Sequence, residues 1–372
     1  MMDDAPKFDP QHSFYRPLPE EVPLKERRIL LSTFYSSVNF EDIMVASGRV
    51  NPEILQSQRL DQELLIGFEF SGKDLSGRRI AGMIDTQGIS SHVTFDSSLV
   101  WKIPDSWTLE DAATVPVVYS TVIYALLMVG DMQPSSSVLI HSATGGIGLA
   151  ALNICLHYKC KIYVTVGTQE KRAYLRENYP QIPDYHIGNS RDTSFEQMIK
   201  RETRNKGVDF TLNSLSEDKL QASVRCLGRG GKFMEIGKYD LANDSSLNLL
   251  LMEKEASYQG IFLDEVFRNF EKKSKVVKRL VEGIEASYRY MMSGTHIGRI
   301  LIKLRNEEED SVTNLQKISK PRILLARFWI LILWGLAIAS RHFGLAFGPI
   351  VPSPSSCEGV FLLLYLSSYS PV

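Results

Sequence analysis

The chain has 372 residues, of which 44% are hydrophobic and 23% charged, proportions close to those of ordinary globular proteins. Its formal net charge of -1 excludes an overall field that would attract nucleic acid or an anionic membrane, and four cysteines in so long a chain exclude a disulfide scaffold. The N-terminal residues MMDDAPKFDP lack the apolar segment of a secretory signal. We therefore expect a cytoplasmic protein of two or three domains.

The first part of the chain is predicted to be β-rich. Residues 1–28 are polar and contain several prolines, which is typical of a loose leader. The segment Arg28–Tyr35 then predicts a strand, and short β-rich pieces follow over residues 79–84 and 92–95. Glycines separate these pieces at Gly67, Gly72, Gly77, Gly82 and Gly88. This spacing predicts a compact β-barrel-like unit.

Two helices are predicted next. Thr108 is placed to cap the first of them, and Asp111 three residues later would complete a capping box. Pro116 interrupts the helical pattern, and an apolar helix resumes over residues 117–128.

From there the pattern becomes strand–helix alternation. Strands are predicted over residues 137–141, 161–166, 208–213 and 231–236, and helices over 146–158, 171–178 and 220–227. Strands separated by helices are typical of a doubly wound parallel sheet, so the predicted fold class is α/β.

A glycine-rich turn links the first of these strands to its helix. The turn comprises Thr144, Gly145, Gly146, Ile147 and Gly148. Glycines there allow the backbone to approach a pyrophosphate, and the helix N-terminus offers N–H groups and the positive end of a dipole. The alternative is a tight strand–helix turn without a ligand, but the strand–turn–helix context favours a dinucleotide site.

The end of the second strand indicates which dinucleotide binds. An NAD-preferring site usually has an acidic residue at this position, and here Gly167 and Thr168 leave it uncharged. Lys171 and Arg172 follow on the next helix, and two cations suit the 2′-phosphate of NADPH. The alternative is an ordinary solvated helix start. We predict NADPH as the cofactor.

The chain resembles the enoyl reductase domain of animal-type fatty acid synthase, in its insect form, which is a zinc-free member of the medium-chain dehydrogenase/reductase superfamily. The resemblance covers roughly residues 28–306. It is carried by the glycine turn and by the stretches at 37–44, 67–72, 115–121, 170–175, 189–197, 212–227, 235–238 and 293–298. The long central stretches are specific to the synthase, whereas the glycine turn alone would fit any member of the superfamily.

The resemblance implies a Rossmann domain inserted into a GroES-like catalytic part. The expected boundaries are a leader at 1–28, the catalytic part at 29–115, the NADP-binding domain at 116–265, a return segment at 266–306 and a tail at 307–372. The implied reaction is NADPH-dependent reduction of a trans-2-enoyl thioester carried on acyl carrier protein. The synthase family is dimeric, so the resemblance also implies a homodimer.

The resemblance further implies roles for individual residues. Lys238 and Asp264 match the family's proposed proton donors, although taken alone they would be a surface lysine and a helix cap. Lys171 matches a lysine that binds the cofactor phosphate. The remaining cofactor-binding candidates lie in matched stretches and are Ser190, Arg191 and Asn213.

No metal site is expected. Zinc-dependent relatives have a Gly-His-Glu sequence where this chain has Gly67-Phe68-Glu69, and phenylalanine cannot bind zinc. His141, beside the glycine turn, is expected to be a satisfied core histidine.

The chain departs from the family in two places. The segment Val281–Tyr288 runs straight through where the family has an additional strand, and this could weaken catalysis. The tail from Ile323 is apolar but interrupted by Arg327 and Arg341, and a buried helix, an interfacial segment and a poor membrane span all fit it. Two alternatives to the synthase enzyme stay open, a stand-alone quinone or alkenal reductase and a non-catalytic NADPH-binding fragment.

Overall fold

The computed structural model describes residues 28–42, 66–85, 87–243, 245–247, 249–263, 266–267, 272, 275–276 and 299–305. They form two compact units, which we call the antiparallel unit (residues 28–42, 66–116 and 300–305) and the parallel unit (residues 117–299). The predicted leader, the shortened segment Val281–Tyr288, Asp264 and the tail lie outside the described residues. The domain boundaries expected from the resemblance therefore stay a prediction.

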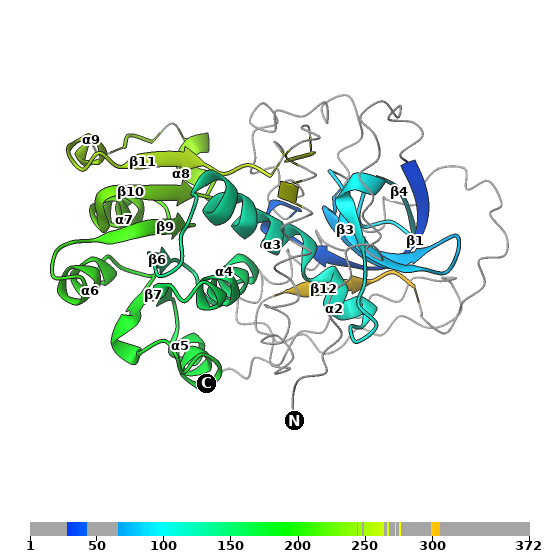
Figure 1. Ribbon diagram of the computed structural model, residues 1–372, viewed down its shortest axis with the longest axis horizontal. Coiled ribbons are helices and arrows are strands. Elements are labelled where there is room, and N and C mark those ends of the chain that lie inside the picture. The colour runs from blue at the N-terminus through cyan, green and yellow to red at the C-terminus, as the bar shows by residue number, and fades with distance from the viewer. Residues whose placement is uncertain are drawn as a thin grey trace, which may run out of the picture. The chain divides into compact units, whose positions relative to one another are not determined.

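The antiparallel unit is built on a six-stranded sheet with the order β12-β1-β2-β3-β5, in which β4 also pairs with β1 (Figure 1). Its strands are β1 (Arg28–Val38), β2 (Glu69–Asp74), β3 (Arg79–Met83), β4 (His92–Asp96), β5 (Val100–Lys102) and β12 (Ile300–Lys303), with the 3-10 turn η3 (Ser97–Leu99) before β5. Leu31, Phe70, Ile80 and Phe95 are buried on one face of this sheet and form its core. The predicted β-rich unit is confirmed.

A short helix, α2 (Leu109–Ala113), packs against this sheet. The capping box is present as predicted, because the Thr108 hydroxyl accepts from the Asp111 N–H at 3.0 Å and the Asp111 carboxylate accepts from the Thr108 N–H at 3.1 Å. These bonds satisfy two N–H groups that a helix start leaves without partners.

The parallel unit contains a second six-stranded sheet, with the order β11-β10-β9-β6-β7-β8 and only parallel pairings (Figure 1). The strands are β6 (Ser137–Ile140), β7 (Lys161–Val166), β8 (Ile187–Asn189), β9 (Val208–Asn213), β10 (Leu227–Glu235) and β11 (Ser257–Gly260). Numbered from β6, this is the order 3-2-1-4-5-6 of the Rossmann fold. The predicted α/β class is confirmed.

Helices precede and connect these strands. They are α3 (Pro116–Val122), α4 (Gly146–His157), α5 (Gln169–Asn178), α6 (Phe195–Glu202), α7 (Asp218–Arg225), α8 (Tyr239–Ala242) and α9 (Leu250–Glu253), with the 3-10 turn η5 (Asp184–His186) before β8. The apolar helix predicted after Pro116 is present, but it becomes a π-helix, η4 (Ile123–Val129), whose end is marked by the Gly130 N–H donating to the Ala125 carbonyl at 2.9 Å. Within the described residues, no helix is long and apolar enough to cross a membrane.

Several elements were not predicted. Strand β8 has three residues and β11 four, which is too short for a clear alternation of apolar and polar positions. Helix α6 was overlooked although its buried residues Phe195, Met198 and Ile199 have helical spacing. These three side chains join Leu139, Tyr163 and Phe233 in the core beneath the sheet.

Candidate functional site

The glycine turn lies just after β6, and the residues between that strand and the turn are bonded to both neighbouring strands. The Ala143 N–H donates to the Thr165 carbonyl of β7 at 3.1 Å, and the His141 N–H donates to the Leu212 carbonyl of β9 at 3.2 Å. Helix α4 then begins at Gly146 with Gly145 as its N-cap, and no side chain caps its first turn. The N–H groups of Gly146, Ile147 and Gly148 are therefore the first in a twelve-residue helix, an arrangement that suits an anionic ligand.

The glycines of the turn have different physical roles. A Cβ on Gly148 would lie 2.5 Å from the Ser142 carbonyl oxygen and 2.6 Å from Ala143 backbone atoms, so no side chain fits. A Cβ on Gly145 would meet only the Ser142 carbonyl oxygen, at 3.3 Å. Gly148 is thus required by the packing of the turn itself, whereas Gly145 leaves room on the side where a cofactor would approach.

This difference predicts that two alanine variants lose unfolding free energy to different extents. Gly148→Ala forces the backbone of the turn to move, so we expect a loss of about 1–3 kcal/mol in unfolding free energy. Gly145→Ala should lower that free energy by about 1 kcal/mol or less, because alanine is a poorer N-cap than glycine but its Cβ would meet a single backbone atom. Urea unfolding of both variants checks this. Equal losses would contradict the assigned roles.

His141 is a satisfied core histidine, as expected. Its Nδ1 lies 2.9 Å from the Thr165 hydroxyl and its Nε2 lies 2.8 Å from the Ser223 hydroxyl. Burial lowers the pKa of the imidazole to about 3, and the ring packs edge-on against Phe195. Both ring nitrogens are therefore used to hold β6 to β7 and α7.

The carboxyl end of β7 carries no acidic side chain. Gly167 follows the strand, and Thr168 caps α5 by accepting from the Lys171 N–H at 3.3 Å. Lys171 is half-buried on the first turn of α5. An uncharged strand end beside a lysine suits a phosphate better than a ribose hydroxyl.

Arg172 lies differently from the sequence interpretation. Its Nε donates to the Asp184 carboxylate at 2.9 Å, its Nη1 to the Ile187 carbonyl at 2.7 Å and its Nη2 to the Asp184 carbonyl at 2.8 Å. Arg176 also contacts Asp184, and these two guanidinium groups, with Arg176 the stronger influence, hold the pKa of that carboxyl below its usual range. Arg172 thus ties α5 to η5 and β8, and phosphate binding would require these bonds to break.

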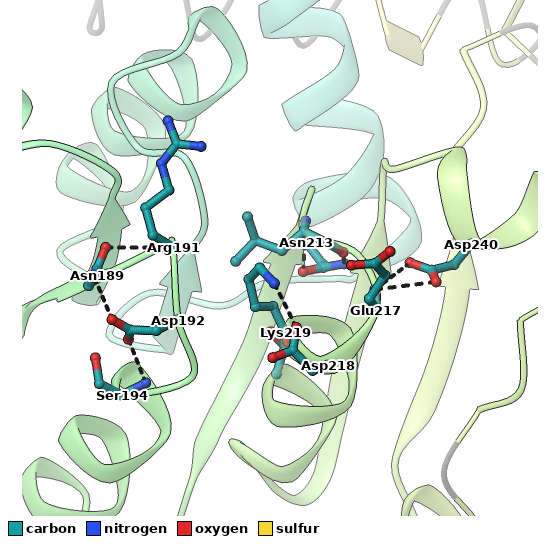
Figure 2. Close-up of polar contacts among 11 residues, drawn as sticks. Asn189, Arg191, Asp192, Ser194, Asn213, Glu217, Asp218, Lys219 and Asp240 are labelled. Carbon is teal, nitrogen blue, oxygen red and sulfur yellow. Dashed lines mark hydrogen bonds and ion pairs between the residues drawn. The ribbon is translucent and has the colours of Figure 1, made fainter. Parts of the chain in front are cut away.

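Arg191, which the sequence also predicted to bind the cofactor, lies over the carboxyl end of β7. A Cβ on Gly167 would lie 2.7 Å from Arg191 Nε and 3.3 Å from the Ser190 hydroxyl, so both side chains overlie the end of β7. The loop that carries Arg191 is fixed because the Arg191 N–H donates to the Asn189 side chain at 3.0 Å and the Ser194 N–H donates to Asp192 at 2.9 Å. Figure 2 shows the exposed Arg191 side chain extending away from this pair of contacts.

Arg299 is a candidate that sequence reasoning missed. A Cβ on Gly146 would lie 3.2 Å from Arg299 Cγ and Cδ, so the side chain of Arg299 packs on the first residue of α4. The signal was present in the matched stretch that ends at Gly298, because a basic residue follows immediately.

A second group of candidates lies at the carboxyl ends of β9 and β10. Asn213 ends β9 fully buried, and its Nδ2 donates to the Leu215 carbonyl and to Glu235 Oε2, each at 2.7 Å. Its amide is therefore engaged within the chain, which makes Asn213 a support for this edge. Glu235 ends β10 and was given no role by the sequence interpretation.

Lys238 lies in the turn after β10 and is the N-cap residue of α8, without a capping bond from its side chain. Its ammonium group is over the Phe262 ring, with 5.9 Å between Nζ and the ring centroid. The other proposed proton donor, Asp264, lies outside the described residues. Lys238 is thus at the carboxyl edge of a parallel sheet, where such folds bind ligands.

The comparable position for a zinc ligand in the antiparallel unit holds Phe68, which is buried. Across the described parts of the chain, no three His, Cys, Asp or Glu side chains are grouped so as to hold a metal ion. The absence of a metal stays a prediction.

The chain is similar in sequence to a dehydrogenase family and to parts of polyketide synthases. The sequence profile of the zinc-binding dehydrogenase family matches residues 146–281. A highly reducing polyketide synthase of Glarea lozoyensis is 36% identical over 301 residues, and a reducing polyketide synthase of Hypomyces subiculosus is 33% identical over 339 residues. These alignments cover 76% and 85% of this chain, which spans only 12% and 14% of the two synthases.

Two solved structures are also similar. The CurK enoyl reductase superposes with a TM-score of 0.65 at 26% identity, over 77% of this chain and 94% of that one. The quinone oxidoreductase of Thermus thermophilus, whose complex with NADPH is known, superposes with a TM-score of 0.57 at 19% identity, over 77% and 94% of the two chains, and this likeness shows the fold alone.

Proposed function

Because the chain is an enoyl reductase domain of the medium-chain dehydrogenase/reductase superfamily, we propose that it reduces trans-2-enoyl thioesters with NADPH. The observation that carries this proposal is the uncharged carboxyl end of β7, overlain by Arg191 and adjacent to Lys171. These cations suit the 2′-phosphate that distinguishes NADPH from NADH.

The residues of the parallel unit fit the cofactor along its length. The first turn of α4 offers backbone N–H groups to the pyrophosphate, and Arg299 beside Gly146 supplies a cation at the same place. Ser190, Arg191 and Lys171 would hold the 2′-phosphate, with Thr168 fixing the start of α5. We propose that Arg172 is a structural residue that keeps α5 and β8 together and does not bind the 2′-phosphate.

The chemistry requires a cation and a proton donor near the thioester. NADPH, when bound, supplies a hydride to the β-carbon of the enoyl group. Negative charge then develops on the thioester oxygen, and the α-carbon must be protonated. Lys238 meets both needs, because an ammonium group stabilises an oxyanion and carries a proton to donate. Asp264 remains the second proposed proton donor, four residues after Gly260 at the end of β11.

We propose acyl carrier protein as the carrier of the substrate, and a synthase as the context in which this domain works. Fatty acid synthesis is the specific pathway that the matched sequence stretches favour. Polyketide synthesis is the second candidate, favoured by the polyketide synthases to which the chain is similar. A homodimer is part of the same proposal.

A panel of acceptors tests the proposed activity. NADPH oxidation should be measured with crotonyl thioester, with a quinone and with an alkenal. Turnover of the thioester alone supports the synthase enzyme, and turnover of the quinone or alkenal alone supports the stand-alone reductase. Binding of NADPH without its oxidation in the presence of any acceptor would support the non-catalytic fragment. Comparing straight-chain with α-methylated enoyl thioesters then separates a fatty acid pathway from one that builds branched polyketides.

A further inference from the structure

A single carboxyl group links the ends of β9 and β10 to strand β11, next to the turn that carries Lys238. Glu235 Oε1 accepts from the Gly237 N–H at 2.6 Å. Its Oε2 accepts from Asn213 Nδ2 at 2.7 Å and from the Tyr258 hydroxyl at 3.2 Å. These partners come from the turn after β10, from β9 and from β11. The residue is 4% exposed, so little water competes for these bonds.

The Lys238 turn has a second tie to the same edge. The Asp240 carboxylate of α8 accepts from the Glu217 N–H at 3.1 and 3.3 Å, as Figure 2 shows. Glu217 has φ +60°, a conformation that is costly for a residue with a side chain and persists only when its surroundings impose it. The turns after β9 and β10 are therefore linked at two points, by Glu235 to Asn213 and by Asp240 to Glu217.

We propose that Glu235 is the positioning residue of Lys238, and that its ionised carboxylate fixes the Gly237–Lys238 turn for proton donation. Three donors converge on the two carboxylate oxygens, which is the pattern that an ionised carboxyl group accepts best. Protonation places a hydrogen on one oxygen and removes an acceptor from this set. Lys238, one residue after Gly237, then loses the constraint at the start of its turn.

The surroundings of Glu235 make this ionisation relevant near neutral pH. Burial raises the pKa of the carboxyl to about 7, against the hydrogen bonds from Asn213, Gly237 and Tyr258, which lower it. The groups that face it are the neutral Asn213 on β9, the Tyr258 hydroxyl on β11 and the negative Asp240 on α8, which raises the pKa further. Below about pH 7, Glu235 of the folded protein is therefore mostly neutral, and above this pH it is mostly ionised.

This inference rests on the proposed function, and pH–rate profiles test it. In the wild type we expect kcat for crotonyl thioester to rise with pH through an apparent pKa near 7. Glu235→Gln should remove this rise and lower kcat at pH 8 by about tenfold, since small misplacements of a catalytic group are costly. NADPH affinity should change less than about twofold, because Glu235 ends β10, which β9 separates from β6 and its glycine turn.

Two further variants shift the same profile in opposite directions. Tyr258→Phe removes a donor to the carboxylate, so the rise should move to higher pH. Asp240→Asn removes a negative charge and should move it to lower pH, while the amide oxygen can still accept from the Glu217 N–H. The matched control is Glu196→Gln, a buried carboxyl on α6 that pairs with Arg225 and Lys200 and should leave the profile unchanged.

If kcat of Glu235→Gln still rises with pH as in the wild type, Glu235 has a purely structural role. This result would overturn the proposal. Shifts of the same sign in Tyr258→Phe and Asp240→Asn would overturn it as well. If the wild type shows no turnover, the proposed function fails, and hydrogen exchange of the Gly237 amide still decides the positioning role. Protection should then increase between pH 6 and 8, relative to the intrinsic exchange rate, in the wild type but not in Glu235→Gln.

Discussion

Lys238→Met is expected to lower kcat for an enoyl thioester by about 10²- to 10⁴-fold, the range for loss of a positioned proton donor. Methionine is close to lysine in length and can still pack on Phe262 through its thioether, although the cation–π contact is lost. The substitution removes the charge that would stabilise the thioester oxygen and the proton that would reach the α-carbon. NADPH affinity should change little, because Lys238 lies at the end of β10, on the opposite side of β6 from β7.

Steady-state kinetics with NADPH and crotonyl thioester, together with NADPH binding by fluorescence, measure both effects. Lys206→Met is the matched control, because this exposed lysine follows α6 and has no place in the proposed site. A Lys238→Met variant with wild-type kcat and a raised KM would show that the lysine binds substrate and takes no part in the chemistry.

The second large effect concerns the choice between NADPH and NADH. Lys171→Ala and Arg191→Ala should each weaken NADPH binding by about 10- to 100-fold, because each removes a charged hydrogen bond to the 2′-phosphate. Binding of NADH, which lacks this phosphate, should change less than about threefold. Calorimetric or fluorescence titrations of both cofactors give the ratio of dissociation constants, and the effect should weaken at high salt.

Arg172→Ala tests whether Arg172 has a structural role or binds the 2′-phosphate, as the sequence predicted. Because its guanidinium group donates to Asp184 and Ile187, we expect this variant to lose stability while the NADPH to NADH ratio stays unchanged. A loss of NADPH binding in Arg172→Ala that equals the loss in Arg191→Ala would restore Arg172 to the 2′-phosphate. Equal losses for NADPH and NADH in Lys171→Ala would remove that residue from the phosphate site.

The sequence predicted the fold well because the strongest patterns are local. The strands predicted over residues 161–166 and 208–213 have these bounds in the structure, and the Thr108–Asp111 capping box is present with both of its hydrogen bonds. The glycine turn was also predictable, since its position between a strand and a helix fixes its role. Elements of three or four residues, such as β8 and β11, give too few positions for such patterns.

The site was predictable only in part, because side-chain partners depend on contacts between distant segments. Lys171 and Arg172 are adjacent in sequence, and both were predicted to bind the 2′-phosphate. In the structure, Arg172 donates to Asp184, and Arg191 lies over Gly167. Glu235 lies in a matched stretch, but its bonds to Asn213 and Tyr258 span 22 and 23 residues. No periodicity or local motif encodes such pairings.

The decisive experiment for enoyl reduction is the transfer of an isotope from cofactor to substrate. The chain would be incubated with crotonyl thioester and NADPH that carries deuterium on either face of the reduced nicotinamide carbon, and the product examined by mass spectrometry and NMR. We expect one of the two labelled cofactors to deliver a single deuterium to the β-carbon of a butyryl thioester. NADPH that binds without forming this product, or a product with no deuterium from either label, would contradict the assignment of this chain as an enoyl thioester reductase.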